Sequence, residues 1–567
     1  MGSMLKKRRY QILEIIVVGS FFAFGLFYEY LACIFGGILG LWLLWEINVQ
    51  KRLKFYFSYK SLIIIMIVLC YLIAALYGVD IGMGSIGFFK NLTIMIFLCC
   101  MMQLDGQQRN KLMEIVPLIG CSMVLCGIVS YAIKPLYDFF FTAERFGGFF
   151  QYANVFAIFC LSGIIILTCR WKSGTSKFFY IMEGILLLVG ILLSGSRTVF
   201  VLTIISFGVL IFYNKSLRMP LIVILAVIVL GAAIYSVLTG NVQSMGRFLT
   251  ISTNSSTFCG RILYAKDGIR LLAKHPFGLG YLGYYFMESS IQTGVYSIRY
   301  IHNDFLQMAL DIGIIPAVFF VVLLITGIIS KRNSFENRLI LFVVSLHMLM
   351  DFDLEFTCIW FLIILCLDIF DEKNMIILEN KKRIYWKVIV GVIAAIEIYI
   401  GGAMFPRYLG DGEISAAFLP FYTEAQKEIL MKETESDKAK GLAEQLLKQN
   451  KYVTEAYDVL AAVSYQNEDY IKMSDYKRKS VEIQKYNKEA YEKYVVLLSA
   501  AIEKADQRGD MTVLEKLLED VLFVKKRISI VERETDELAY KIKDIPDFTL
   551  HENVENYILQ VEEITGN

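Results

Sequence analysis

The chain contains few of the residues that build metal sites and disulfide frameworks. It has 11 cysteines and 4 histidines in 567 residues, and its last cysteine is Cys366. No C-x-x-C pair and no cluster of cysteine with histidine occurs, which argues against a structural zinc site or a set of disulfides. Residues 405–567 also lack any apolar run of membrane-spanning length. The two parts of the chain therefore differ in kind.

Residues 1–404 are dominated by the long apolar runs that the tail lacks. The whole chain is 56% hydrophobic with a mean hydropathy of +0.54, which is too apolar for a soluble enzyme. Runs long enough to cross a hydrocarbon core of roughly 30 Å recur from Tyr10 to Met404. The sequence predicts an all-α polytopic membrane domain over residues 1–404 and a soluble helical domain over residues 405–567.

Basic residues set the direction of the membrane spans. The run Lys6-Lys7-Arg8-Arg9 places the N-terminus in the cytoplasm, and the later basic loops alternate consistently with that start. A large loop over residues 239–301 then lies outside the cell. The predicted spans are residues 11–28, 31–48, 61–78, 88–103, 113–133, 153–169, 179–193, 198–213, 220–238, 303–329, 337–350, 353–370 and 386–404.

The number of spans decides the side of the tail. Thirteen spans place residues 405–567 on the extracytoplasmic side. The two spans that flank Asp351-Phe352-Asp353 are short, and together they can also be interpreted as one bent element. Twelve spans would put the tail in the cytoplasm.

The tail has a weak internal repeat. Glu455-Ala456-Tyr457 recurs as Glu489-Ala490-Tyr491 after 34 residues, which is the period of tetratricopeptide helix pairs. Apolar and charged positions alternate at helical spacing around both copies. We interpret the tail as a tetratricopeptide-like domain that binds a partner or shapes access to the membrane; the alternative is a generic helical bundle.

With the spans arranged in this way, several basic residues lie on the extracytoplasmic side, where short loops normally carry little positive charge. Arginine forks match the geometry of phosphate, so an anionic substrate presented by the membrane would explain the pattern. The residues concerned are Arg145, Arg197, Arg247, Arg261, Arg270, Arg299 and His302.

Four motifs occur in a fixed order along this outer face. They are the run from Arg145 to Asn154, the Leu-Ser-Gly-Ser-Arg run that ends at Arg197, the Gly260–Gly280 segment that ends in Pro-Phe-Gly-Leu-Gly, and the His-Asn pair at His302. Together they resemble the O-antigen ligase and O-antigen polymerase superfamily over roughly residues 10–370. The sequence departs from the family pattern at two positions, with Tyr264 in place of the usual Trp and Ala153 in place of a frequent Pro.

The resemblance implies a type C glycosyltransferase-like bundle of about 12–13 transmembrane helices in the bacterial inner membrane. It implies transfer of a glycan from undecaprenyl pyrophosphate to an acceptor hydroxyl at the extracytoplasmic face, with no metal or other cofactor. The expected partners are the lipid-linked donor, a glycan, lipid or protein acceptor, membrane lipids and a protein that binds the tail, but no nucleic acid. A carboxylate cluster that would suit Mg²⁺ is absent from the predicted outer loops.

We assign catalysis to Arg197, Arg261 and His302. Arg197 follows a Ser-Gly-Ser turn whose N–H groups can face an anion, and Arg261 lies on a predicted external helix over residues 258–274. His302 opens a span, where a helix N-terminus disfavours the imidazolium and so leaves a general base. The alternatives are a headgroup contact or ion pair for Arg197, and an interfacial hydrogen bond for His302.

Eight further residues are predicted to bind substrate. The glycines lie beside tyrosines that suit sugar rings, although interfacial tyrosine belts are common. The asparagine can instead cap a helix, and the aspartate can either orient the His302 ring or oppose the effect of the helix dipole on it. The eight are Arg145, Arg247, Arg270, Asn303, Asp304, Gly278, Gly280 and Tyr281.

Three classes of function stay open on the sequence alone. A ligase and a polymerase differ only in the acceptor, and an outer repeat domain slightly favours the ligase. A flippase or transporter would need ionisable residues within the spans, where we find mainly Glu183 and Glu397. A non-catalytic scaffold would not need so many spans. Asp351, Asp353 and Glu355 either bind acceptor hydroxyls or pair with the arginines.

Overall fold

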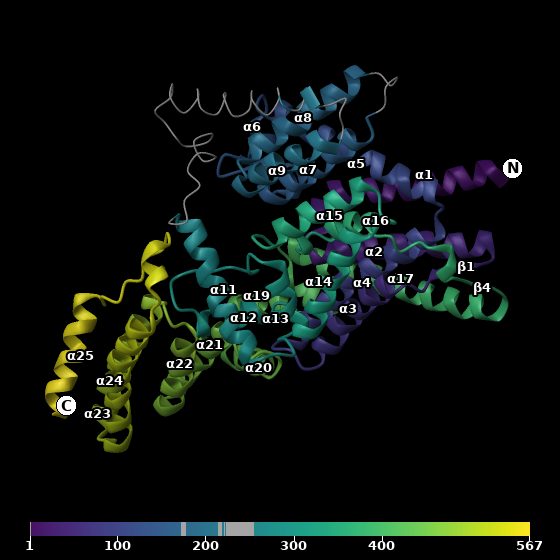
Figure 1. Ribbon diagram of the computed structural model, residues 1–567. Helices are drawn as coiled ribbons and strands as arrows, with labels where there is room; N and C mark the ends of the chain where they lie inside the picture. The colour runs from purple at the N-terminus through teal and green to yellow at the C-terminus, as the bar shows by residue number, and fades with distance from the viewer. Residues whose placement is uncertain (1, 172–176, 214–217, 220–221, 223–254, 567) are drawn as a thin grey trace.

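The computed structural model describes residues 2–566 apart from 172–176, 214–217, 220–221 and 223–254 (Figure 1). The elements up to residue 408 are α1 (Gly2–Phe22), η1 (Phe24–Leu26), α2 (Glu29–Gln50), β1 (Leu53–Tyr56), α3 (Tyr59–Ala75), α4 (Ile81–Gln103), α5 (Gly106–Ser130), α6 (Lys134–Phe140), β2 (Phe141–Thr142), β3 (Arg145–Phe146), η2 (Gly148–Phe150), α7 (Ala153–Cys169), α8 (Lys177–Ser194), α9 (Arg197–Tyr213), α11 (Ser256–Lys274), α12 (Gly283–Ile291), α13 (Asp304–Ile312), α14 (Ile314–Ile329), α15 (Phe335–Met348), η4 (Asp353–Glu355), α16 (Thr357–Cys366), η5 (Glu372–Asn374), β4 (Met375–Leu378) and α17 (Asn380–Tyr408).

Helices account for nearly all of this part. Within the described residues, α2, α4, α5 and α17 are long and apolar enough to cross a membrane alone, and six shorter apolar helices accompany them. The sheets in the described part of the chain are two small antiparallel pairs, β1 with β4 and β2 with β3. The prediction of a polytopic helical membrane protein is confirmed. The predicted span 220–238 lies largely outside the described residues.

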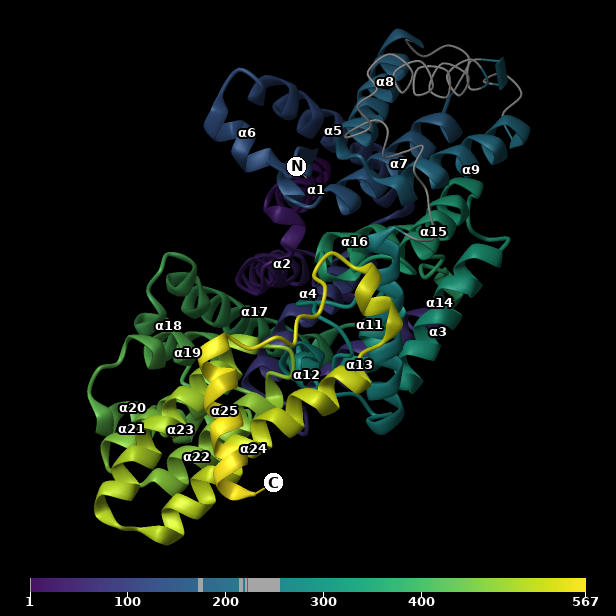
Figure 2. The ribbon, with the colours of Figure 1, turned by 90° about the vertical axis from the view of Figure 1, so that its left-hand side faces the viewer.

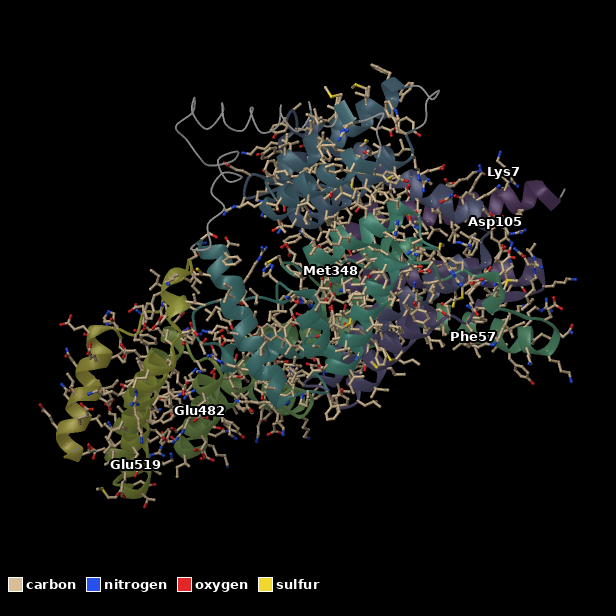
Figure 3. All side chains as sticks on the ribbon, in the orientation of Figure 1. Lys7, Phe57, Asp105, Met348, Glu482 and Glu519 are labelled. Carbon is tan, nitrogen blue, oxygen red and sulfur yellow. The ribbon has the colours of Figure 1, made fainter. Side chains whose placement is uncertain are left out.

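Contacts between loops define two opposite faces of the helical bundle. At one face Lys6 pairs with Asp105 at 3.0 Å and Arg332 pairs with Asp371 at 2.6 Å. Lys7, Phe57 and Asp105 lie at this end in Figure 3, far from Glu482 and Glu519 of the tail. Loops that the charge rule assigns to the cytoplasm therefore meet at one face, and the remaining described loops meet at the other.

The two short spans around Asp351 are separate in the structure. The helix α15 starts beside the loop that holds Arg332, and the chain turns at η4 before α16 runs back. Past α16, Asp368 accepts a hydrogen bond from Ser330 at 2.6 Å and pairs with Lys60, so the chain has returned to its starting face. These two predicted spans are therefore two helices and not one bent element.

The predicted span 303–329 is broken into two helices. Gly313 separates α13 from α14 and has φ of 98°, a conformation that other residues rarely adopt. A Cβ at this position would lie 2.9 Å from the carbonyl carbon of Phe277. The break therefore lets the segment after α11 pack against the bundle.

Close helix packing in the bundle depends on small residues. In α2, a Cβ on Gly37 would lie 2.4 Å from the Ile398 side chain of α17, and one on Gly40 would lie 2.8 Å from Ala394. Glycine at such positions lets two helix backbones approach, which is how helices commonly associate in membranes. Aromatic rings fill the interior elsewhere, as in the stacked pair Phe97 and Phe361 at 3.8 Å.

The bundle buries more ionisable residues than the two, Glu183 and Glu397, that the sequence analysis named. Arg9 pairs with Glu46 at 2.6 Å and Lys90 pairs with Glu355 at 2.7 Å, and all four are buried. Because each charge has a protein partner, these residues satisfy one another within the bundle. Glu397 is also fully buried.

The tail is an array of amphipathic helices. Two apolar clusters hold it together, one among α19, α20 and α21 and one among α21 to α25. Its elements are α18 (Gly412–Phe418), α19 (Thr423–Lys432), α20 (Ser436–Gln449), α21 (Thr454–Gln466), α22 (Tyr470–Ile483), α23 (Lys488–Arg508), α24 (Met511–Glu534), η6 (Glu537–Lys541) and α25 (Glu552–Thr565). The repeated Glu-Ala-Tyr triplets both lie in the first turn of a helix, α21 and α23. Equivalence to a tetratricopeptide array stays a prediction.

The tail packs against the bundle at a defined point. Asp80, which caps α4, is buried and accepts hydrogen bonds from Thr423 at 2.7 Å and from Asn450 at 2.9 Å. The tail therefore lies on the face that carries the loop before α4, which the charge rule places outside. In Figure 1, α11 and α12 lie between the bundle and the tail helices.

Candidate active site

A cavity of about 570 Å³ opens beside the first turns of α9 and α11. Arg145, Arg197 and Arg261, three of the predicted site residues, all line it. The lining comes from four separate parts of the chain, within residues 143–154, 195–202 and 255–261 and at Met350. Met350 follows the end of α15, which Met348 marks in Figure 3. The fold thus brings together arginines that are 116 positions apart (145 to 261) in the sequence.

The turn between α8 and α9 brings the first residues of α9 to the edge of the cavity. Gly195 has φ of 59°, so the chain reverses sharply between α8 and α9. The Arg145 Nε donates a hydrogen bond to the Ser194 carbonyl at 2.8 Å, which fixes that guanidinium against the turn. The buried Ser196 hydroxyl has no hydrogen-bond partner among the described residues and lines the cavity. The N-terminus of α9 therefore presents Arg197, N–H groups and a hydroxyl to one space.

A chain of hydrogen bonds connects Arg145 to a buried carboxylate. Arg145 Nη2 donates to the Asn154 side-chain oxygen at 2.5 Å, and Asn154 Nδ2 donates to Asp351 Oδ2 at 2.5 Å. The Tyr152 hydroxyl donates to Asp351 Oδ1 at 2.7 Å. The run from Arg145 to Asn154, which the sequence singled out, thus meets the loop between α15 and η4.

Asp351 is the centre of the site. Its side chain is 1% exposed, and Arg261 Nη2 lies 3.4 Å from Oδ2 while His302 Nδ1 lies 3.3 Å from Oδ1. Burial alone would raise the pKa of the Asp351 carboxyl. The hydrogen bond from His302 and the charges of His302 and Arg261 outweigh burial and hold that pKa below its usual value. The carboxylate therefore stays ionised beside both groups.

The Arg261 guanidinium has a hydrogen-bond donor that Asp351 does not use. Its Nη2 contacts Asp351, and its buried Nε has no hydrogen-bond partner among the described residues. The side chain is 17% exposed and reaches the cavity from the second turn of α11. A buried unpaired donor is costly, and an anion in the cavity would supply the acceptor.

His302 stands next to the cavity and is not part of its lining. Asp351 holds its Nδ1, and the ring centre lies 5.1 Å from that of Phe352. His302 and Arg261 share the two oxygens of one carboxylate, which fixes their separation. A ring held at Nδ1 leaves Nε2 for a reacting group.

Asn303 and Asp304 have structural roles. The Asn303 side chain caps α13 by accepting from the Leu306 N–H at 2.9 Å, as its alternative interpretation predicted. The Asp304 carboxylate accepts from the backbone N–H of Asp353 at 2.8 Å and does not contact the His302 ring. The predicted role of Asp304 as an orienter of His302 is therefore wrong. Asp304 instead holds the loop that carries Asp351.

Four other predicted substrate residues lie away from the cavity. Arg270 pairs with Asp267 at 3.1 Å on the opposite side of α11 from Arg261. Gly278 and Gly280 have φ of 90° and 80°. Each of them packs closely against the backbone of another segment, and Gly278 lies beside Gly313. Glycine is needed there for close approach, so the interpretation of this turn as a sugar site is not supported.

Tyr281 is the fourth of these residues. It is 2% exposed, and its hydroxyl donates to Glu29 at 2.9 Å and lies 3.2 Å from Lys90. The structure gives Tyr281 a place in a buried charge network, where no substrate reaches it. Arg299 joins the same network by pairing with Glu29 at 2.9 Å. The predicted residue Arg247 lies outside the described residues.

From the sequence alone, Asp351 had no definite role and Tyr152 was not predicted as a site residue. Asp351 was one of three carboxylates with an open role, because nothing near it in the sequence identifies its partners. Its distance from Tyr152 is 199 positions and from Arg261 it is 90. The available signal was the position of an acidic pair at the outer end of a predicted span.

The arrangement suits an anion with several oxygens. Three guanidinium groups and a helix N-terminus surround one space, and one fixed carboxylate connects two of the cations to a histidine. Among the described residues, no group of three or more His, Cys, Asp or Glu side chains could hold a metal ion. The basic side chains that line the cavity are those of Arg145, Arg197 and Arg261.

A comparison with protein families agrees with this geometry. Residues 184–321 match the O-antigen ligase family model, and Arg197, Arg261 and His302 all lie in this range. Arg145 and Asp351 lie outside it and join the site through the fold. No significant match is found among curated proteins. Residues 184–321 of this multi-pass membrane protein are therefore an O-antigen ligase domain, of the glycan ligase and polymerase kind.

Proposed function

We propose that this protein is a glycosyltransferase that moves a glycan from undecaprenyl pyrophosphate to an acceptor hydroxyl at the extracytoplasmic face of the bacterial cell membrane. The observation that carries the proposal is the convergence of Arg145, Arg197 and Arg261 on one cavity, with Asp351 and His302 at its edge. The basic loops at the opposite face support the orientation, because such loops stay in the cytoplasm.

The arginines act on the leaving group. In the proposed step the acceptor oxygen bonds to the anomeric carbon, and the bond from that carbon to the pyrophosphate oxygen breaks. The pyrophosphate leaves with the bonding electron pair, so negative charge grows on the oxygen that departs. Donors fixed in a site that excludes water stabilise such charge by about 3–4 kcal/mol each. Arg261, with its unpaired Nε, is the strongest candidate for this contact.

His302 acts on the acceptor. Its Nε2 takes the proton that the acceptor hydroxyl loses, and the Asp351 carboxylate stabilises the imidazolium that forms. Asp351 also pairs with Arg261, so the base and the leaving-group cation are positioned by the same side chain. The resulting proton leaves to solvent after the glycan has moved.

Within this activity we propose the ligase type, with a polymerase as the second candidate. The contacts of Asp80 with the tail support the ligase type, because a large helical surface beside the bundle would suit the approach of a distinct acceptor. A polymerase would need room for a second lipid-linked glycan at the same cavity. Both share the arginines and the histidine.

Reconstitution of the purified protein in liposomes separates these two candidates. The protein receives a polyprenyl-pyrophosphate-linked oligosaccharide alone, and the products are resolved by gel and mass spectrometry. A ligase gives no product until an acceptor is added, whereas a polymerase lengthens the chains on the carrier lipid. Translocation of intact donor without any glycosidic bond formation would contradict the glycosyltransferase proposal and favour a flippase.

Chelation of divalent ions is expected to leave the rate unchanged. Arginine supplies the positive charge at the cavity, so treatment with EDTA removes nothing that the proposed step uses. The measurement is the initial rate of transfer before and after EDTA, in buffer without added metal. Strong inhibition that Mg²⁺ or Mn²⁺ reverses, at constant vesicle integrity, would contradict the arginine mechanism.

A further inference from the structure

One segment of the tail lies directly on the helix that carries Arg261. We call it the strap and define it as Glu534–Ile542, which runs from the end of α24 through η6. Figure 2 shows this yellow part of the chain beside α11. The strap is 260 positions away from α11 along the sequence, because α11 ends at residue 274 and the strap begins at residue 534.

Polar contacts fix the strap to the ligase domain. Asp536 pairs with Lys266 of α11, and its backbone N–H donates to the Thr293 carbonyl at 2.9 Å. Glu534 pairs with Lys485 at 3.1 Å, and Lys485 also reaches the Gln292 carbonyl. The strap therefore bonds both to α11 and to the segment that follows α12.

An apolar cluster supports the same contact. Ala539 and Ile542 of the strap are buried against Cys259, Leu263 and Tyr296. The approach is close, because a Cβ on Gly294 would lie 2.7 Å from the Cβ of Ala539. Buried apolar contact of this kind excludes water and holds the strap in one register.

The strap touches the side of α11 that faces away from Arg261. At about 100° of rotation per residue, Cys259, Leu263, Lys266 and Arg270 all lie about 140–200° around the axis from Arg261. The side near Arg261 packs instead on α13 and the residue Ile301 before it, since a Cβ on Gly268 would lie 3.2 Å from the Leu306 side chain and 2.5 Å from that of Ile301. The helix is thus enclosed between the bundle and the strap.

We propose that the strap is a positioning element that holds α11 so that Arg261 reaches both Asp351 and the donor pyrophosphate. The proposal rests on the proposed function and extends it, because it makes the soluble tail part of the donor site. A displacement of about 1 Å at a reacting group can cost about a hundredfold in rate. The strap residues act through α11 and do not touch substrate.

Two variants test the strap. Asp536→Ala removes the ion pair with Lys266, and Ala539→Trp forces the strap away from Gly294. The matched control is Glu519→Gln, an exposed acidic residue on α24 labelled in Figure 3. Hydrogen exchange of the amides in residues 259–271 reports on α11 independently of any chemistry. Both strap variants are expected to increase that exchange, and the control is not.

The decisive measurement is the affinity for undecaprenyl pyrophosphate in detergent micelles. We expect the strap variants to bind it at least about tenfold more weakly than the wild type and the control, because Arg261 is no longer held. Faster exchange in α11 with unchanged affinity would overturn the proposal. This readout involves no glycan transfer, so failure of the proposed function would appear separately, as wild-type protein that binds the lipid pyrophosphate and forms no glycosidic bond.

A disulfide lock covers the case in which a strap variant folds poorly. Gly294→Cys and Ala539→Cys are combined with Asp536→Ala, in a Cys259→Ala background because Cys259 packs in the same cluster. The two Cβ atoms would start closer than in an ordinary disulfide, so a small shift of the strap is needed. Oxidation is expected to restore the affinity and reduction to remove it again. Equal affinity in both redox states, with the crosslink verified by mass spectrometry, would contradict the proposal.

Discussion

Replacing Arg261 by alanine is expected to lower the transfer rate by about a hundredfold to a thousandfold. The expected size is that of removing one fixed donor to a developing negative charge. The variant keeps Tyr152 and Asn154 on Asp351, so the carboxylate remains hydrogen-bonded and the bundle is expected to stay folded. The measurement is the initial rate with a lipid-linked oligosaccharide in liposomes, together with the melting temperature in detergent.

Two companion variants make this result specific. Arg261→Lys keeps the charge and loses the planar fork, so we expect a rate between those of the wild type and Arg261→Ala. Lys274→Ala removes an exposed positive charge from the last turn of the same helix and should leave the rate within about twofold of the wild type. Near-normal transfer by a folded Arg261→Ala variant would remove this residue from the donor site.

The arginine cluster could be predicted because its signal is local and ordered. Arg145 precedes a glycine pair, Arg197 follows a Ser-Gly-Ser turn, and both fall on the face where basic residues are least expected. The structure adds the reason that these two meet, which is the hydrogen bond from Arg145 to the Ser194 carbonyl. No sequence pattern encodes that contact.

Tyr281 shows where such reasoning fails. A tyrosine beside glycines near a membrane surface is compatible with a sugar platform, and equally with an interfacial belt. Its actual partners, Glu29 and Lys90, lie 252 and 191 positions away, and they turn the hydroxyl into the interior. Charge pairing at long range overrides the local pattern, because an unpaired charge in the bundle would be far more costly.

The order of the membrane spans could be predicted from the sequence, but breaks within a span could not. Hydropathy and basic loops predict the order of the crossings, since both are properties of short segments. They do not show that Gly313 divides one apolar run into α13 and α14, because a run of apolar residues looks the same with or without a break. The left-handed backbone at that glycine depends on its contact with Phe277, which only the tertiary structure supplies.

Asp351→Asn is expected to cost about a hundredfold to ten-thousandfold in transfer, the range usual for general acid–base catalysis. Both carboxylate oxygens accept hydrogen bonds from Tyr152 and Asn154. An amide would turn an NH₂ group toward one of these donors and would no longer stabilise an imidazolium at His302. The measurement is transfer at saturating donor, with Asp371→Asn at the opposite face as the matched control.

The pH profile distinguishes loss of catalysis from loss of structure. The pKa of Asp351 is held below its usual value, so its contribution to stability is complete above about pH 4 and is lost only as the pH falls further. Any change in transfer between pH 5 and pH 8 must then come from another group. If His302 is the base, a folded His302→Gln variant is slow across this whole pH range. Near-wild-type transfer by a folded His302→Gln variant would show that a different residue takes the proton, and Asp351 would then act only by holding Arg261.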